Sequence, residues 1–245
     1  MSWTPPSASR LYAVIDTTWP AAGMQEIGPF TLRRGAGGGQ RVSSASLRKD
    51  HFTPRDIETV EQAMDAIAQP RLFMIRDQDQ TLDGALAGRG YFIKDPVTLF
   101  AAPSAKLAEL DPKGLVAIDA PEPLAVMAEI WQKGGIGPGR LQVMRRAPAP
   151  KAYFLGRIMD QPAGAMFVGC DGAIAMMHAL EIMPDMRRLG LGRLMMGAAG
   201  ASALRNGAAT FSLVVLSTNT AACGLYRSLG MVEVGRYHYR KQEAL

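Results

Sequence analysis

The segment Arg187-Arg188-Leu189-Gly190-Leu191-Gly192 lies between an apolar run that Pro184 ends and a stretch rich in leucine, methionine and alanine. The apolar run, Ala173–Met183, is typical of a buried strand, and Arg193–Asn206 has the apolar spacing of a helix. Glycines in such a turn let a phosphate reach the backbone N–H groups, and the start of a helix adds partial positive charge. The segment is therefore predicted to bind a phosphate group.

The residues before this loop predict an antiparallel meander. Tyr153–Met159 and Ala165–Val168 are expected to be strands joined by a turn at Gln161–Gly164, and the Asp171-Gly172 pair is a strong hairpin signal leading into Ala173–Met183. A dinucleotide-binding fold requires three glycines and a βαβ unit. Antiparallel hairpins before the loop do not fit that fold.

The residues after the loop continue the alternation of strand and helix. Thr210–Leu216 is predicted as a buried strand, Ser217–Leu229 as a helix capped by Ser217 or Thr218, and Met231–Lys241 as one or two closing strands. The whole pattern indicates an α/β (α+β) protein.

A weaker copy of this pattern occupies the first hundred residues. Leu72–Ile75, Thr81–Ala87 and Phe92–Phe100 repeat the order strand, helix, strand, and a helix is expected at Pro54–Ala68. The stretch Leu47–Thr53 before that helix has no glycine, so the first unit is not expected to hold a pyrophosphate.

The repeat predicts two domains, 1–102 and 114–245. The linker 103–113 between them is rich in turn-forming residues and is followed by Gly114. Within the first unit, Phe30–Arg34 and Val42–Leu47 are expected to be strands. The glycine run 35–39 between them is either a plain hairpin loop or a loop that contacts substrate.

The loop and a second motif together resemble the GNAT superfamily of acetyl-CoA-dependent N-acetyltransferases. The second motif is Asn219-x-x-Ala222-x-x-Leu225-Tyr226-x-x-Leu229-Gly230-Met231, with methionine where the family has phenylalanine. The resemblance covers Tyr153–Arg240. The weaker first unit and the ending Tyr237-His238-Tyr239-Arg240 resemble bacterial tandem-GNAT proteins with a degenerate N-terminal half.

The resemblance implies acetyl-CoA as co-substrate and a set of residues that bind it. The strand would pair with the pantetheine arm, the Ile182 N–H would face the thioester oxygen, the loop would wrap the pyrophosphate, and Asn219 would hold the CoA arm. The implied cofactor-binding residues are Leu180, Glu181, Ile182, Arg187, Arg188, Leu189, Gly190, Leu191, Gly192, Arg193 and Asn219.

The resemblance also implies catalytic residues. Tyr226 would give its proton to the departing thiolate. Some family members carry a glutamate base where this chain has Val214, so another base is needed to deprotonate the amine. His178 is the first candidate, because a histidine can accept a proton at neutral pH. Glu181 is the second, and strand alternation would place it on the opposite face unless a bulge intervenes.

The composition limits the partners. No apolar run reaches the roughly 18 residues of a membrane span, and the N-terminus does not resemble a secretory signal, so a cytoplasmic protein without membrane contact is expected. Two cysteines and three histidines give no metal-ligand spacing, so no metal is expected. The net charge of +5 is scattered along the chain, which argues against nucleic acid.

The expected reaction is acetyl transfer to a primary amine of a small molecule or amino acid by direct attack, without a covalent enzyme intermediate. The alternatives are a protein or peptide acetyltransferase acting on N-termini or lysines, and a non-catalytic CoA-binding sensor. We expect a monomer or a homodimer.

Overall fold

Antiparallel hairpins and two parallel contacts build one eleven-stranded sheet in the computed structural model, which describes residues 3–112 and 116–242. The strand order is β1-β2-β3-β4-β11-β5-β10-β9-β8-β7-β6. The strands are β1 (Gly23–Ile27), β2 (Phe30–Arg34), β3 (Ala45–Leu47), β4 (Leu72–Arg76), β5 (Phe92–Pro103), β6 (Ala117–Ala120), β7 (Lys151–Ile158), β8 (Gln161–Asp171), β9 (Ile174–Ile182), β10 (Thr210–Leu216) and β11 (Val232–Lys241).

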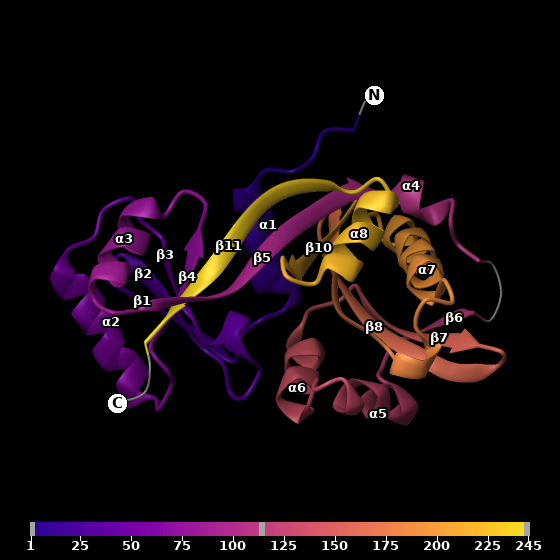
Figure 1. The fold of residues 1–245 in the computed structure, drawn as a ribbon, viewed down its shortest axis with the longest axis horizontal. Coiled ribbons are helices and arrows are strands. Elements are labelled where there is room, and N and C mark those ends of the chain that lie inside the picture. Colours follow the sequence, from indigo (N-terminus) through magenta and orange to yellow (C-terminus); the bar gives the residue numbers. More distant parts are fainter. Residues whose placement is uncertain (1–2, 113–115, 243–245) are drawn as a thin grey trace.

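Helices cover the sheet in both halves (Figure 1). They are α1 (Ala8–Thr18), α2 (Pro54–Ala66), α3 (Gln80–Gly88), α4 (Ser104–Ala108), α5 (Ala125–Lys133), α6 (Pro138–Arg146), α7 (Leu191–Arg205) and α8 (Thr220–Ser228). The combination of mostly antiparallel strands and flanking helices confirms the predicted fold class.

The last strand of the chain lies inside the first half of the sheet. β11 pairs with β4 on one side and with β5 on the other, and β5 in turn pairs with β10 of the second half. Figure 1 shows β5 and β11 running side by side between the two groups of helices. The predicted domain division remains a prediction. Residue 113 of its linker and Gly114 lie outside the described residues.

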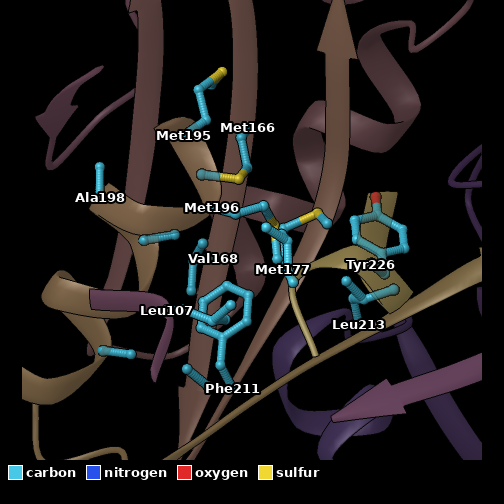
Figure 2. Close-up of a cluster of buried hydrophobic side chains, with 14 of the residues drawn as sticks. Leu107, Met166, Val168, Met177, Met195, Met196, Ala198, Phe211, Leu213 and Tyr226 are labelled. Atoms are coloured by element: carbon cyan, nitrogen blue, oxygen red, sulfur yellow. The ribbon is translucent and has the colours of Figure 1, made fainter. Parts of the chain in front are cut away.

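The core of the second half lies between the sheet and α7. Its largest cluster contains the methionines that α7 turns toward the sheet, together with Phe211 of β10 and Tyr226 of α8 (Figure 2). All four side chains of the methionine pairs Met176-Met177 and Met195-Met196 are buried. Flexible thioethers fill irregular gaps in such a core.

Several predicted elements agree closely with the structure, and three local predictions are wrong. β2 and β10 have the predicted bounds. The expected strand at Val42–Leu47 is a 3₁₀ turn at Gln40–Val42 followed by the short β3. The expected turn at Gln161–Gly164 belongs to β8, because the reversal occurs at Met159 and Asp160, which both have positive φ.

The third correction concerns the start of α8. Asn219, and neither Ser217 nor Thr218, caps this helix, because the Asn219 side chain accepts a hydrogen bond from the Ala222 N–H at 3.1 Å. Asparagine is among the best capping residues.

None of the described helices is both long and apolar enough to cross a bilayer.

Candidate active site

The site begins where β9 and β10 separate. The two strands pair in parallel from Thr210 with Ile174 to Leu213 with Met177, and beyond that point β10 stays with β5 while β9 stays with β8. A cavity of about 860 Å³ opens between the separated ends. Its walls include Ala179–Ile182 from β9 and Val214–Leu216 from β10.

The free edge of β9 faces this cavity. The Met183 N–H donates to the Ala163 carbonyl at 2.9 Å, while Ile182 stands opposite Gly164. In an antiparallel ladder this arrangement makes Ile182 and Gly164 a non-hydrogen-bonded pair, so the Ile182 N–H points away from β8. The Ile182 carbonyl, on the same edge, accepts from Nε of Arg187 at 3.0 Å. An edge N–H is thus open toward β10.

The predicted phosphate loop borders the same cavity. Gly190 has φ of +82° and precedes the first residue of α7, and its helix end has no side-chain cap. The first N–H groups of a helix lack intrahelical partners and lie at the positive end of its dipole. Arg188 and Arg193 line the cavity, are exposed, and form no ion pair within the described residues. This end of the cavity therefore suits a phosphate group.

The corresponding helix of the first half is closed to an anion. At the start of α2, the Thr53 side chain accepts from the Asp56 N–H, and the Asp56 carboxylate accepts from the Thr53 N–H at 2.7 Å. This reciprocal capping box places a carboxylate where a phosphate would bind.

Tyr226 contributes a phenol from α8. Its ring packs 6.0 Å from that of Phe100 and is almost fully buried, yet the residue lines the cavity. Figure 2 shows the hydroxyl pointing away from Leu213 at the edge of the core. Burial, reinforced by the neighbouring Cys223, raises the pKa of the Tyr226 hydroxyl. The phenol therefore stays protonated across the physiological range.

A β-bulge shapes β9 just before its free edge. His178 pairs with Phe167 and Glu181 pairs with Ala165, so two residues of β9, Ala179 and Leu180, stand opposite the single residue between those partners. Ala179 has φ of +53°, and its carbonyl accepts from Nε1 of Trp131 at 2.8 Å. Bulges often redirect a side chain next to an active site.

The bulge turns Glu181 to the same face of the sheet as His178, because their partners are two residues apart on β8. Strand alternation alone predicts opposite faces, and the bulge is the exception that the sequence left open. Glu181 lines the cavity, and one carboxylate oxygen lies 3.0 Å from the guanidinium of Arg187. Gly134, at the end of α5, leaves room for this side chain, since a Cβ there would lie 2.6 Å from it.

His178 is buried outside the cavity wall. The Thr18 hydroxyl donates its hydrogen to the Val14 carbonyl at 2.7 Å, so at 2.8 Å it must accept from Nε2 of His178. Nδ1 therefore carries the lone pair, and it lies 3.1 Å from the Arg41 guanidinium, which can only donate. Burial, followed by the charge of Arg41, lowers the pKa of His178 well below its ordinary value.

This environment removes the lone pair that a general base needs, which argues against the first candidate base. Glu181 is the candidate base that faces the cavity.

The predicted cofactor-binding residues lie on the cavity wall, except for Leu189. Those that line the cavity are Leu180, Glu181, Ile182, Arg187, Arg188, Gly190, Leu191, Gly192, Arg193 and Asn219. Within residues 3–112 and 116–242, no cluster of three or more metal-ligating side chains occurs.

Comparison with known proteins agrees with this geometry. The sequence profile described as "Acetyltransferase (GNAT) family" matches residues 120–231. Residues 120–231 are therefore a GNAT-family acetyltransferase domain, which makes the protein an acyltransferase. None of the curated proteins matches it.

Solved structures extend the similarity over almost the whole GNAT chain. A GCN5-related N-acetyltransferase from Kribbella flavida is 17% identical, with a TM-score of 0.76, covering 97% of this chain and 96% of the other. A conserved protein of unknown function from Staphylococcus epidermidis is 14% identical, with a TM-score of 0.72 and coverage of 94% and 97%. A tandem GNAT protein from the clavulanic acid biosynthesis pathway is 13% identical, with a TM-score of 0.63 and coverage of 99% and 89%. At these identities the likeness concerns the fold.

The remaining wall of the GNAT cavity comes from residues that the sequence did not single out as site residues. Trp19, Gly38, Gly39, Gln40, Arg41 and Asp95 approach from the first half, and Tyr237 and Tyr239 from β11. In the sequence, the glycine run 35–39 indicated this part of the wall, because a loop that contacts substrate was one of its two interpretations. Two of its glycines do line the cavity.

Proposed function

We propose that this GNAT enzyme transfers an acetyl group from acetyl-CoA to the primary amine of a small molecule or amino acid. The observation that carries the proposal is the separation of β9 and β10, which leaves a strand edge open beside an uncapped helix start. An extended pantetheine arm can pair with such an edge, as in other cases of strand addition. The pyrophosphate would then lie on the Arg188–Arg193 loop.

The open edge also supplies electrostatic stabilisation. When the amine attacks the thioester carbonyl, negative charge develops on the carbonyl oxygen. An N–H that is already aimed into a cavity stabilises that charge without reorganisation. Ile182 provides such a group, and the proposal assigns it to the thioester oxygen.

Proton transfers complete the reaction. Glu181, oriented by Arg187, would accept the proton that the ammonium form of the acceptor must lose, directly or through a water molecule. The amine nitrogen then forms the bond to the acetyl carbon while the carbon–sulfur bond breaks. Tyr226, which burial keeps protonated, would donate its proton to the thiolate as the carbon–sulfur bond breaks. The proton that the acylated nitrogen then loses would return to the Tyr226 phenolate through water.

The first half of the chain favours a small acceptor over a protein. Gly38–Arg41 line the cavity from the first half of the chain, and in this proposal they wall off its acceptor side. A protein or peptide substrate needs an open groove there. A non-catalytic CoA sensor would need none of the proton-transfer groups, although both Glu181 and Tyr226 line the cavity.

Acetyl-CoA binding tests the cofactor site. Isothermal titration of Arg188→Glu should show at least a tenfold loss of affinity, because a carboxylate would face the pyrophosphate. Arg55→Glu makes the same charge change on an exposed position of α2 and should bind acetyl-CoA normally. Equal affinities for the two variants would refute the assignment of the loop.

Turnover tests the enzyme against the sensor. Thiol release from acetyl-CoA should be measured with a panel of amines, amino acids and peptides. Tyr226→Phe should keep acetyl-CoA affinity and lose most of the thiol release. A wild-type protein that binds acetyl-CoA and acetylates no member of the panel would favour the sensor.

A further inference from the structure

The cavity wall contributed by the first half includes a half-buried arginine, Arg41, whose environment is unusual for a cation. Arg41 is the middle residue of the 3₁₀ turn Gln40–Val42 that follows the glycine run, and its Nε lies 3.3 Å from the Tyr237 hydroxyl. Its guanidinium carbon lies 5.7 Å from the centre of the Trp19 ring. These two contacts come from the residue that caps α1 and from β11, so two other elements hold the side chain.

The contact with His178 fixes the direction of the guanidinium. Because Thr18 accepts from Nε2, the lone pair on Nδ1 is available only to Arg41, at 3.1 Å. The imidazole is thereby a neutral acceptor that orients the arginine. His178 is in this sense a positioning residue, which explains why a histidine stands on β9 although it does not face the cavity.

No carboxylate of the described residues lies within ion-pair distance of Arg41. Its partners within residues 3–112 and 116–242 are neutral groups, namely the side chains of Tyr237, His178 and Tyr239. The carboxylate on the same wall, Asp95, accepts from Gln40 at 2.6 Å and lies 4.0 Å from Lys94. The arginine therefore has no carboxylate partner beside the cavity within the described residues.

Arg33 shows how this chain treats an arginine with a purely structural role. Its Nε and NH2 each lie 2.7 Å from an oxygen of Asp16, and its NH1 donates to Ser46 at 2.9 Å. A buried charge is costly unless it is paired and hydrogen-bonded. Arg33 meets that requirement within the protein, and Arg41 does not.

We propose that Arg41 binds a carboxylate of the acceptor, so that the acceptor class is amines that also carry a carboxylate, amino acids among them. A guanidinium without a carboxylate partner matches a planar monoanion, which it can bind through two hydrogen bonds. A second guanidinium, that of Arg140, lines the same cavity. This inference rests on the proposed acetyl transfer at the same cavity.

The position of Arg41 relative to the bulge supports this orientation of the acceptor. Its contact, His178, lies on β9 directly before the bulge, and Glu181 and Ile182 lie directly after it. An acceptor with its carboxylate on Arg41 extends along the bulge toward the thioester position. The amine of a carboxylate-bearing acceptor is then presented to Glu181.

The test uses matched sets of compounds with the full-length protein and acetyl-CoA. Each set contains an α-, β- or ω-amino acid, its carboxamide, and the amine without the carboxyl group. Thiol release should be measurable for at least one amino acid, with kcat/KM at least tenfold above those of its two matched analogues. Equal turnover of the analogues would overturn the inference and leave acetyl transfer standing.

Variants separate recognition from folding. Arg41→Gln should raise KM for the preferred amino acid by about 10- to 100-fold, the effect expected for a lost charged hydrogen bond, with a much smaller change in kcat. Arg41→Lys keeps the charge without the planar fork and should recover part of the affinity. Arg145→Gln removes a charge from an exposed position of α6 outside the cavity and should leave KM unchanged.

The role of His178 in orienting Arg41 gives a further test. His178→Gln should raise KM in the same direction as Arg41→Gln and should retain the kcat of the parent enzyme within a few-fold. If Arg41→Gln still binds acetyl-CoA, melts at the parent temperature and keeps its preference for the amino acid over the carboxamide, the inference is wrong. If the parent protein binds no acetyl-CoA, the proposed function fails instead.

Discussion

At the scale of single residues, Glu181 and His178 of β9 point to the same face of the sheet but differ in whether they have a free lone pair. Glu181 has a carboxylate oxygen on the cavity wall, while both ring nitrogens of His178 are already engaged. A general base must have a free lone pair within reach of the proton that it removes. The hydrogen bonds of the two side chains therefore decide which of them can act as a general base.

Glu181→Gln should lower kcat by about 10²- to 10⁴-fold at neutral pH, the range expected when a positioned base is lost. Acetyl-CoA affinity should change little, because the amide retains the shape of the side chain. Steady-state kinetics with the best acceptor, combined with titration of acetyl-CoA, measures both quantities. Glu129→Gln on the exposed side of α5 is the matched control. A Glu181→Gln enzyme with parental kcat would exclude this carboxylate as the base.

His178 should make the folded protein sensitive to acid. Its pKa is lowered in the folded state, chiefly by burial, so below the ordinary pKa of about 6.5 the unfolded chain binds the proton more readily. The stabilisation is thus complete above pH 6.5 and falls below it, by up to about 1.4 kcal/mol per pH unit from this group. Urea unfolding between pH 5 and 7.5 measures the slope.

His178→Gln should flatten that pH dependence even if it shifts the overall stability, since the slope and not the absolute value reports the titration. His51→Gln, at an exposed position, should leave the slope as in the parent protein. An unchanged slope in His178→Gln would show that other groups cause the acid sensitivity.

At the scale of elements, the start of α7 depends on one backbone conformation. Gly190 has φ of +82°, and a Cβ at this position would meet no atom within 4 Å. Gly190→Ala therefore adds conformational strain of about 1–2 kcal/mol without a steric clash. We expect this variant to lose stability by that amount and to bind acetyl-CoA more weakly, as measured by urea unfolding and calorimetric titration.

Gly84→Ala is the matched control for this prediction. It also meets no atom within 4 Å, but it lies inside α3, where alanine is preferred over glycine by about 0.5–1 kcal/mol. The control should therefore be slightly stabilised and bind acetyl-CoA normally. Equal stabilisation of both variants would mean that the loop tolerates a different backbone conformation.

The elements also show which parts of the site a sequence can reveal. The loop, α7 and β10 were predictable because glycine, capping and apolar periodicity act within a few residues. The bulge at Ala179 was not, because it depends on the register with β8 and on the indole of Trp131. The role of His178 was not predictable either, since Arg41 lies 137 residues away in the chain.

At the scale of the whole molecule, strand order connects the two halves of the sequence more tightly than a linker would. β11 supplies the strand between β4 and β5, and β5 supplies the strand between β11 and β10. The same exchange brings Tyr237 of β11 to Arg41 and Asp95 of β5 to the cavity wall. The acceptor side of the site therefore exists only when both halves are folded together.

This exchange predicts that the halves do not fold alone. A fragment ending at Pro112 has no strand between β4 and β5, and the complementary fragment lacks the strand that joins β10 to β11. The first fragment would expose one edge of β4 and both edges of β5, and the second one edge of β10 and both edges of β11. Unpaired strand edges favour aggregation. We expect the separate fragments to be unfolded or aggregated by circular dichroism and gel filtration, and the two co-expressed fragments to form a folded complex.

The intact chain should then unfold in one cooperative transition, with equal calorimetric and van't Hoff enthalpies. A protease site inserted after Pro112 and cleaved in the folded protein is the control, because paired strands still hold the pieces together after the cut. The cleaved complex should keep its far-ultraviolet spectrum and elute as one species. A fragment 1–112 that alone gives a folded spectrum and its own sharp transition would show that the first half completes its sheet without β11.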